Sequence, residues 1–324
     1  MIKNLIIIRS AFIFFCMIIL TLIAGVSVSG KSYLGYYHDL SNSSSDFRVT
    51  RVYVNFKATV LEKDDMVLKF RFTPDIDYKS SGMYYLYTKY AYVELAKDKF
   101  HFYFGQHSTP YLGYIMKHYW KYRFIEKLAT HHFKLTTTAD RGLSVKYSHP
   151  LFSTHVGIYT GEGYKHEETG LGKDVIGRFT LNLPIQAAKV QLHGYAQLGN
   201  ATYFDTLDVS RELFGGALSA VFKGVVFYTE YFTGKNVGLG SKYFDKADVF
   251  STFVVLPVAG NCLFLRYDVL GKDNLQTISK RYLVGGFVYR LSSKYKVAID
   301  YKKELDGAGN TTGHSIGLDM EVKF

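Results

Sequence analysis

The C-terminal stretch Ser315–Phe324, which reads SIGLDMEVKF, decides the fold of this chain. Its apolar residues stand at every second position: Ile316, Leu318, Met320, Val322 and Phe324. Because successive side chains of a β-strand point to opposite faces, the segment has one apolar face and one polar face. A strand of a water-soluble sandwich could show the same alternation, so the recurrence and spacing of the pattern decide between the two interpretations.

The alternation recurs along the chain. It is clear in Tyr295–Lys302, Leu263–Val269, Val52–Val60 and Leu68–Thr73, where charged residues of both signs take the polar positions. A strand that crosses a membrane as part of a barrel needs about ten residues, apolar towards lipid and polar towards the interior. A charge on the lipid face at mid-depth costs roughly 2–4 kcal/mol, which explains why the alternation is strict. The pattern therefore predicts an all-β fold, a transmembrane antiparallel β-barrel.

Sixteen segments of this kind predict sixteen strands. They cover approximately residues 32–40, 47–61, 66–75, 84–96, 99–106, 141–148, 152–160, 174–183, 187–198, 211–222, 224–233, 245–257, 261–270, 278–291, 295–304 and 313–324. An even number of strands brings both termini of the chain to the same, periplasmic side. Short connections such as Ser148–Pro150 and Pro184–Ile185 are predicted to be periplasmic turns. Longer polar ones such as Gly161–Lys173 and Gly234–Lys242 are predicted to be outer loops.

The first 29 residues have the layout of a secretory signal peptide. Two basic residues, Lys3 and Arg9, precede the apolar run Ala11–Ala24, and small residues lead up to Ser29. A cleaved signal peptide has this arrangement. The alternative is an uncleaved membrane anchor, because the apolar run is just long enough to allow one. We expect cleavage near Ser29, and one barrel domain over residues 30–324.

Composition and charge agree with an exported β protein. The chain holds 28 Tyr, 25 Phe and only 5 Pro, and aromatic residues suit a pleated surface. Removal of Lys3 and Arg9 with the signal peptide lowers the net charge from +11 to +9 and leaves Cys262 as the single cysteine. A basic balance suggests nucleic acid, a membrane surface or a small anion as partner. Export argues against nucleic acid.

One segment, residues 107–140, breaks the alternation. It is too long for an idle connection, and it is basic and aromatic. Its cations are Lys117, Lys121, Arg123, Lys127 and Lys134, with Glu126 as the only acid among them. A sixteen-stranded barrel leaves an aqueous channel, and a long loop folded into that channel would narrow it. We therefore expect residues 107–140 to be a constriction loop.

Several short motifs resemble the phosphate-selective porin family. They are Tyr90–Val93, Gly105–Gly113, Phe124–Lys127, Asp140–Gly142 and the basic strand around Arg48 and Arg51, so the resemblance is best over residues 45–160. It implies a sixteen-stranded, trimeric porin of the Gram-negative outer membrane with its third long loop folded inward. The terminal Phe324 resembles the signal read by the outer-membrane assembly machinery.

Lumen-facing cations are the candidate functional residues, because cation-rich walls concentrate anions. The candidates are Arg51, Lys57, Lys69, Arg71 and Arg141 on strands and Lys117, Lys121, Arg123, Lys127 and Lys134 in the loop. Alternatively, single members of this set pair with inward carboxylates such as Glu94, Glu126 or Asp140 and only hold the loop down. Arg51 has lumen parity because Val52 faces lipid. Arg48 has the opposite parity, so it lies beyond the membrane or follows a bulge.

The sequence favours passive diffusion of small anions, with phosphate as one candidate, through a homotrimeric porin in contact with lipid and lipopolysaccharide. The alternative is a structural or adhesive barrel that its long loop plugs. Enzyme activity is not expected, since no G-x-S-x-G elbow marks a hydrolytic site. Neither a cofactor nor a metal is expected, because the adjacent His131 and His132 would point apart on an extended chain.

Overall fold

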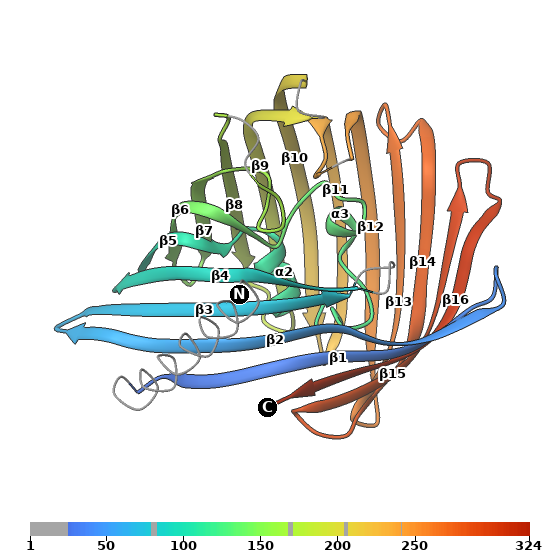
Figure 1. Cartoon of the computed structure of the whole chain (residues 1–324), viewed down its shortest axis with the longest axis horizontal. Helices are drawn as coiled ribbons and strands as arrows, with labels where there is room; N and C mark the ends of the chain where they lie inside the picture. Colours follow the sequence, from blue (N-terminus) through green and yellow to red (C-terminus); the bar gives the residue numbers. More distant parts are fainter. Residues whose placement is uncertain (1–24, 79–82, 168–170, 204–206, 241) are drawn as a thin grey trace, which may run out of the picture.

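The computed structural model describes residues 25–78, 83–167, 171–203, 207–240 and 242–324. Within these ranges, sixteen antiparallel strands form a closed barrel in which sequence neighbours pair and β1 pairs with β16 (Figure 1). The strands are β1 (Ser27–Asp39), β2 (Ser44–Lys63), β3 (Met66–Tyr78), β4 (Tyr84–Lys97), β5 (Phe100–Ser108), β6 (Ala139–Ser148), β7 (Phe152–Tyr159), β8 (Asp174–Leu183), β9 (Lys189–Tyr203), β10 (Leu207–Phe222), β11 (Val225–Val237), β12 (Phe244–Val258), β13 (Asn261–Lys272), β14 (Thr277–Arg290), β15 (Tyr295–Asp306) and β16 (Thr311–Lys323). The predicted fold class and strand number are confirmed.

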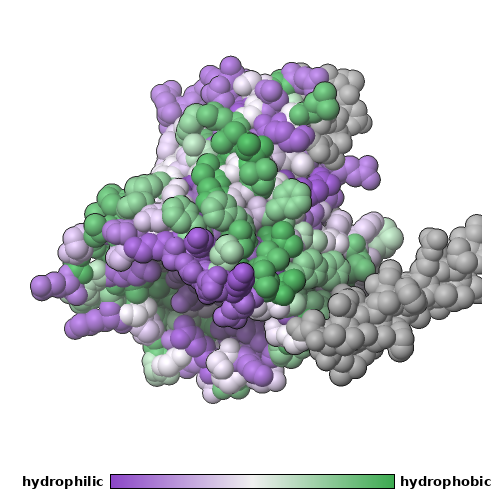
Figure 2. Space-filling model, turned by 90° about the vertical axis from the view of Figure 1, so that its left-hand side faces the viewer, coloured by the Kyte–Doolittle hydropathy of each residue, from purple (hydrophilic) through white to green (hydrophobic). Residues whose placement is uncertain are grey.

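The two faces of the wall follow the alternation in the sequence. On β13, Leu263 and Leu265 are 45% and 51% exposed, whereas Phe264 and Arg266 are buried. On β16, the apolar Leu318 is exposed and Asp319 is fully buried. Figure 2 shows several apolar patches on the face turned to the viewer, with hydrophilic side chains between them. Apolar residues thus cover the outside of the wall, and polar and aromatic residues fill the inside, as expected for a barrel in lipid.

The barrel closes where the first and last strands meet. The Gly30 amide donates to the Phe324 carbonyl at 2.9 Å, and the Phe324 amide donates back to Gly30 at 3.1 Å. β1 begins at Ser27, so the last residues of the predicted signal segment belong to a strand here. The rest of that prediction, residues 1–24, lies outside the described residues.

The connections differ between the two ends of the barrel. At one end they are short: residues 64–65, 98–99, 149–151, 184–188, 223–224, 259–260 and 291–294. At the other end the third connection spans residues 109–138 and carries the helices α2 (Leu112–His118) and α3 (Ala129–His132). We call this end the outer end, in keeping with the predicted topology. In the ranges that the structure covers, no helix combines the length and the apolar character needed to cross a membrane.

Candidate functional site

The connection 109–138 lies against the inner face of the wall, and Figure 1 shows its helices within the ring of strands. The Tyr111 hydroxyl donates to Glu230 of β11 at 2.7 Å. Trp120 is fully buried, with its ring 5.1 Å from that of Phe253 on β12 and 5.8 Å from that of Phe264 on β13. These partners lie on the buried faces of their strands, so the connection fills the part of the lumen beside β11–β13.

Three wall residues hold the tip of this connection, residues 125–127. Arg266 Nη1 donates to the Lys127 carbonyl at 2.5 Å, and Lys302 Nζ donates to the Ile125 carbonyl at 2.9 Å. The Tyr282 hydroxyl donates to Glu126 Oε2 at 2.8 Å. Hydrogen bonds to charged groups are the stronger class, so this clamp fixes the position of the neighbouring loop cations.

Within the described part of the chain, two large cavities lie in the lumen beside β1–β4, β15 and β16. The outer cavity measures about 580 Å³ and the inner one about 510 Å³. Tyr33 and Arg123 line both, so the two cavities adjoin at these side chains. Arg123 comes from the long connection and Tyr33 from the opposite wall, which makes their meeting point the candidate constriction.

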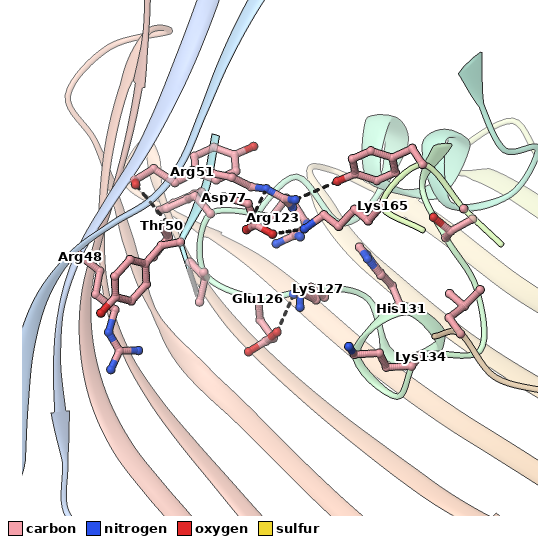
Figure 3. A pocket seen from close by; sticks show the side chains of 18 of the residues that line it. Arg48, Thr50, Arg51, Asp77, Arg123, Glu126, Lys127, His131, Lys134 and Lys165 are labelled. Carbon is pink, nitrogen blue, oxygen red and sulfur yellow. Dashed lines mark hydrogen bonds and ion pairs between the residues drawn. The ribbon is translucent and has the colours of Figure 1, made fainter. Parts of the chain in front are cut away.

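Cations outnumber carboxylates in both cavities. The outer cavity is lined by Arg48, Arg51, Arg123, Lys127, Lys134, Lys165 and Lys302, with Asp77, Glu126 and Glu162 (Figure 3). The inner cavity is lined by Lys31, Arg71, Lys89, Lys117, Lys121, Arg123, Lys296 and Lys323, with Glu321. A water-filled path with such walls is electropositive, and the inner half is the more one-sided.

The structure brings seven of the ten predicted cations to these cavities. Arg51, Lys127 and Lys134 line the outer cavity, Arg71, Lys117 and Lys121 line the inner one, and Arg123 lines both. Lys57 and Lys69 are exposed and lie on the lumen side of β2 and β3, beyond the residues that line the inner cavity.

The structure places Arg141 differently from the expectation. It lies on the face of β6 that carries the exposed Leu143, whereas Asp140 and Ser144 are buried on the opposite face. Its Nη2 donates to the His166 carbonyl at 2.8 Å. On β6 the even-numbered residues Asp140 and Ser144 face the lumen. The neighbouring Arg141 therefore faces outward, and the lumen position expected for it is wrong.

Several of the cations are neutralised by carboxylates. Arg51 forms a buried ion pair with Asp75 at 3.0 Å, and Lys302 lies 3.3 Å from Asp300. Lys296 pairs with Glu321 at 2.9 Å. These three cations therefore form ion pairs with lumen carboxylates, as the alternative interpretation of the sequence expects. The partner of Arg51 is Asp75, however, and not Glu94, Glu126 or Asp140.

Other cations carry no such partner. Arg123 Nη2 is buried and has no hydrogen-bond partner in the described part of the chain. Lys89 is buried, and its Nζ lies 3.2 Å from the Tyr53 hydroxyl and 4.7 Å from the centre of that ring. No ion pair joins Lys89 to a carboxylate among the described residues. A buried charge without a partner is costly, and these two groups lack the carboxylate that Arg51 and Lys296 have.

Two bulges explain which cations the alternation missed. Tyr33 pairs with Arg51 but Leu34 pairs with Val49, so Thr50 is an extra residue and Arg48 shares the lumen face with Arg51. The bulge considered for Arg48 is thus present.

On β4, Lys89 is the extra residue, because Thr73 pairs with Tyr90 and Pro74 pairs with Thr88. Bulges arise from pairing with the next strand, which alternation within one strand does not reveal. Lys31, Lys165, Lys296, Lys302 and Lys323 complete the set of lining cations absent from the predicted site. For Lys296 and Lys302, the signal was available in their polar-face positions on the strand 295–304.

The loop also tunes the charge of its own residues. Burial and the nearby Arg123 lower the pKa of Lys127 to about 8. Burial alone would raise the pKa of Glu126, but the hydrogen bond from His132 and the charges of Lys302 and Arg266 bring it well below its usual range. Glu126 therefore stays ionised as the anchor of the clamp, while Lys127 titrates close to neutral pH.

In the described ranges, no group of three or more His, Cys, Asp or Glu side chains is placed to hold a metal ion. No family model matches the chain, and none of the curated proteins does. The similarity of this chain to known proteins therefore lies in its fold.

Solved barrels from several bacteria are similar to this structure. OmpF of Salmonella typhi, in complex with daunomycin, gives a TM-score of 0.69 at 10% identity over 92% of this chain and 97% of that one. An anion-selective porin from Comamonas acidovorans gives 0.68 at 11% identity over 92% and 99%. The outer membrane channel DcaP of Acinetobacter baumannii gives 0.63 at 10% identity over 92% and 97%. The chain therefore has the sixteen-stranded barrel fold of outer-membrane porins and channels.

Proposed function

We propose that the chain is an outer-membrane pore for the passive diffusion of small solutes and that it favours anions. The observation that carries the proposal is the pair of adjoining cavities whose walls hold many more Lys and Arg than Asp and Glu. Fixed cations raise the local concentration of anions in a narrow, low-dielectric surround. Rings of Lys and Arg select anions in pores by the same physics.

Arg123 is the residue most directly tied to this preference. It stands where both cavities meet, and one of its guanidinium nitrogens has no protein partner in the described residues. The surrounding Lys127, Lys121 and Lys89 add positive charge on both sides. An anion that passes this point exchanges part of its water for these donors, and the unpaired ones give it a site without breaking an ion pair.

The rest of the proposal concerns the setting of the pore. Residues 1–29 would direct export, the exposed apolar belt would contact lipid and lipopolysaccharide, and Phe324 would be read by the assembly machinery. The mature chain would act as a homotrimer. Phosphate is one candidate among the small anions, on the strength of the resemblance in residues 45–160.

Reversal potentials across planar bilayers under a salt gradient test the anion preference. We expect the wild-type channel to prefer anions and the Arg123→Met variant to lose part of that preference. One unit charge at about 4 Å in water contributes about 1 kcal/mol, which corresponds to a change of about five-fold in the anion-to-cation permeability ratio.

Lys235→Met is the matched control, because it removes the same charge from the exposed, outward side of β11. It should leave the reversal potential unchanged. A cation-preferring wild-type channel would overturn the anion preference. Equal effects of the two variants would show that overall charge, rather than the constriction, sets it.

The second candidate is a plugged barrel with little transport. The aromatic packing of the long connection favours it, since Tyr111, Trp120, Tyr122 and Phe124 are all buried in the lumen. The same bilayer experiment separates the two: folded protein that inserts and gives no conductance would identify a plug.

A further inference from the structure

A second connection also enters the lumen. Residues 161–166, here called the strap, follow β7 and contribute Glu162, Lys165 and His166 to the lining of the outer cavity. Gly161 and Gly163 have φ values of +91° and +79°, a region that residues with a Cβ rarely adopt. The two glycines allow the chain to turn into the lumen, so the start of Gly161–Lys173 differs from the outer loop that the sequence predicts.

The strap is rooted on β6. The Tyr164 amide donates to the Ala139 carbonyl at 3.1 Å, and Arg141 Nη2 donates to the His166 carbonyl at 2.8 Å. The Gly161 amide donates to Asp140 Oδ2 at 2.8 Å. In all three bonds the strap contributes a main-chain amide or carbonyl. The attachment to β6 therefore does not depend on the side chains of the strap.

Two side chains of the strap, those of Tyr164 and Lys165, reach across to β2 and β3. The Tyr164 hydroxyl accepts a hydrogen bond from Arg51 Nη2 and donates one to Asp75 Oδ2, both at 2.8 Å. Lys165 Nζ forms an ion pair with Asp77, and Figure 3 shows Lys165 reaching this carboxylate beside Arg51. We call these three contacts of Tyr164 and Lys165 the latch.

The latch changes the role of Arg51. Its Nε and Nη2 already serve Asp75 at 3.1 and 3.0 Å, and Nη2 also serves Tyr164. Arg51 is 4% exposed and Asp75 is fully buried. Because two of its three guanidinium nitrogens already donate hydrogen bonds, Arg51 has few free donors for a passing anion. It acts instead as a positioning residue that holds the Tyr164 side chain across the cavity.

We propose that the strap sets the width of the outer entrance and that the Tyr164 and Lys165 latch holds it in the narrow position. The inference rests on the proposed pore and adds a second size-limiting element, placed above the Arg123 constriction. Released from β2 and β3, the Tyr164 and Lys165 side chains turn away from the outer cavity, while the main chain of the strap stays bonded to β6. Larger solutes then enter from the outer end, while access from the short-turn end stays as before.

The test uses the double variant Tyr164→Phe/Lys165→Met in the full-length protein, with neutral polyethylene glycols of graded length added to one side of the bilayer. Neutral polymers report width without responding to the lost charge. We expect the size cut-off to shift to longer polymers on the outer side only, together with a larger single-channel conductance. Lys165→Arg, which keeps the ion pair, should behave as wild type. Lys242→Met, which removes one charge from the exposed β11–β12 connection, should also leave the cut-off unchanged.

Each outcome bears on a different claim. If the size cut-off on the outer side is the same in the wild type and the double variant, the proposed role of the strap is wrong. A shift of the size cut-off on both sides of the bilayer would mean that the variant loosens the whole barrel, and this result would also contradict the proposal. Absence of any wild-type conductance would instead overturn the pore itself. If the double variant fails to fold, as judged by its gel mobility before heating, each single variant is measured in its place.

Discussion

Among single residues, Lys127 is expected to make the anion preference of the proposed pore depend on pH. Burial and Arg123 lower its pKa to about 8, so it is charged below that pH and neutral above it. We expect the anion preference to fall as the pH is raised from about 7 to about 9, because the charged fraction of a group changes across its pKa. Reversal potentials measured over this range check the prediction.

Lys127→Arg is the control for that titration, since a guanidinium stays charged throughout the range. The pH dependence should become smaller, and what remains belongs in part to Lys165, whose pKa burial lowers to about 7. A pH profile that Lys127→Arg leaves unaltered would place the titrating group elsewhere.

Individual site residues were predictable only as far as parity within a strand reaches. It predicts lumen positions for Arg51 on β2 and Arg71 on β3, where the structure has them, because each is followed by an apolar residue, Val52 or Phe72. It did not find Lys89, whose inward position comes from a bulge set by the pairing of β3 with β4. Parity also does not reveal that the Arg51 guanidinium donates hydrogen bonds to Asp75 and Tyr164, since Tyr164 is 113 positions away in sequence.

At the scale of elements, the clamp on the long connection predicts how firmly that connection is docked. Tyr282→Phe removes the hydroxyl that donates to the ionised Glu126, a loss of about 1.5–3 kcal/mol for a bond to a charged group. Trp120 is the single tryptophan of the chain and is fully buried in this connection, so its fluorescence reports docking alone. We expect acrylamide to quench Trp120 more strongly in the variant.

Tyr289→Phe serves as its control, because Tyr289 lies on the same strand and is 50% exposed on the outer side. Its quenching should match that of wild type. Equal quenching in all three proteins would mean that the other clamp residues, Arg266 and Lys302, hold the tip without Tyr282.

The existence of this connection was predictable, but its internal structure was not. Loss of alternation marked residues 107–140, and the strands on either side end at Ser108 and restart at Ala139. The helices α2 and α3 have only seven and four residues. Helices this short are not stable by themselves and depend on tertiary packing, here on the inner wall, which a local pattern does not contain.

For the whole molecule, alternation was sufficient because a barrel repeats one rule around its circumference. Each strand faces lipid on one side, and a misplaced charge there is costly, so the pattern recurs around the wall despite local bulges such as those in β2 and β4. The interior obeys no such rule. Its cations, carboxylates and tyrosines meet across strands far apart in sequence, and the resulting pairs decide which cations remain available to an anion.

The closure of the barrel between β1 and β16 provides the last prediction. A Cβ added at Gly30 would lie 2.2 Å from Phe324 Cζ and 2.7 Å from the Tyr53 carbonyl oxygen, and the latter is backbone that cannot move aside freely. Gly30→Ala should therefore destabilise the folded barrel by about 1–3 kcal/mol, the usual range for overpacking. Gly194→Ala on β9 adds the same methyl group where no atom lies within 4 Å, and it should change stability by no more than about 0.5 kcal/mol. The temperature at which gel mobility shifts on heating measures both. A lower temperature for Gly30→Ala alone would show that the Phe324 end, packed on Gly30, closes the barrel, whereas equal temperatures would show that this end carries little of its stability.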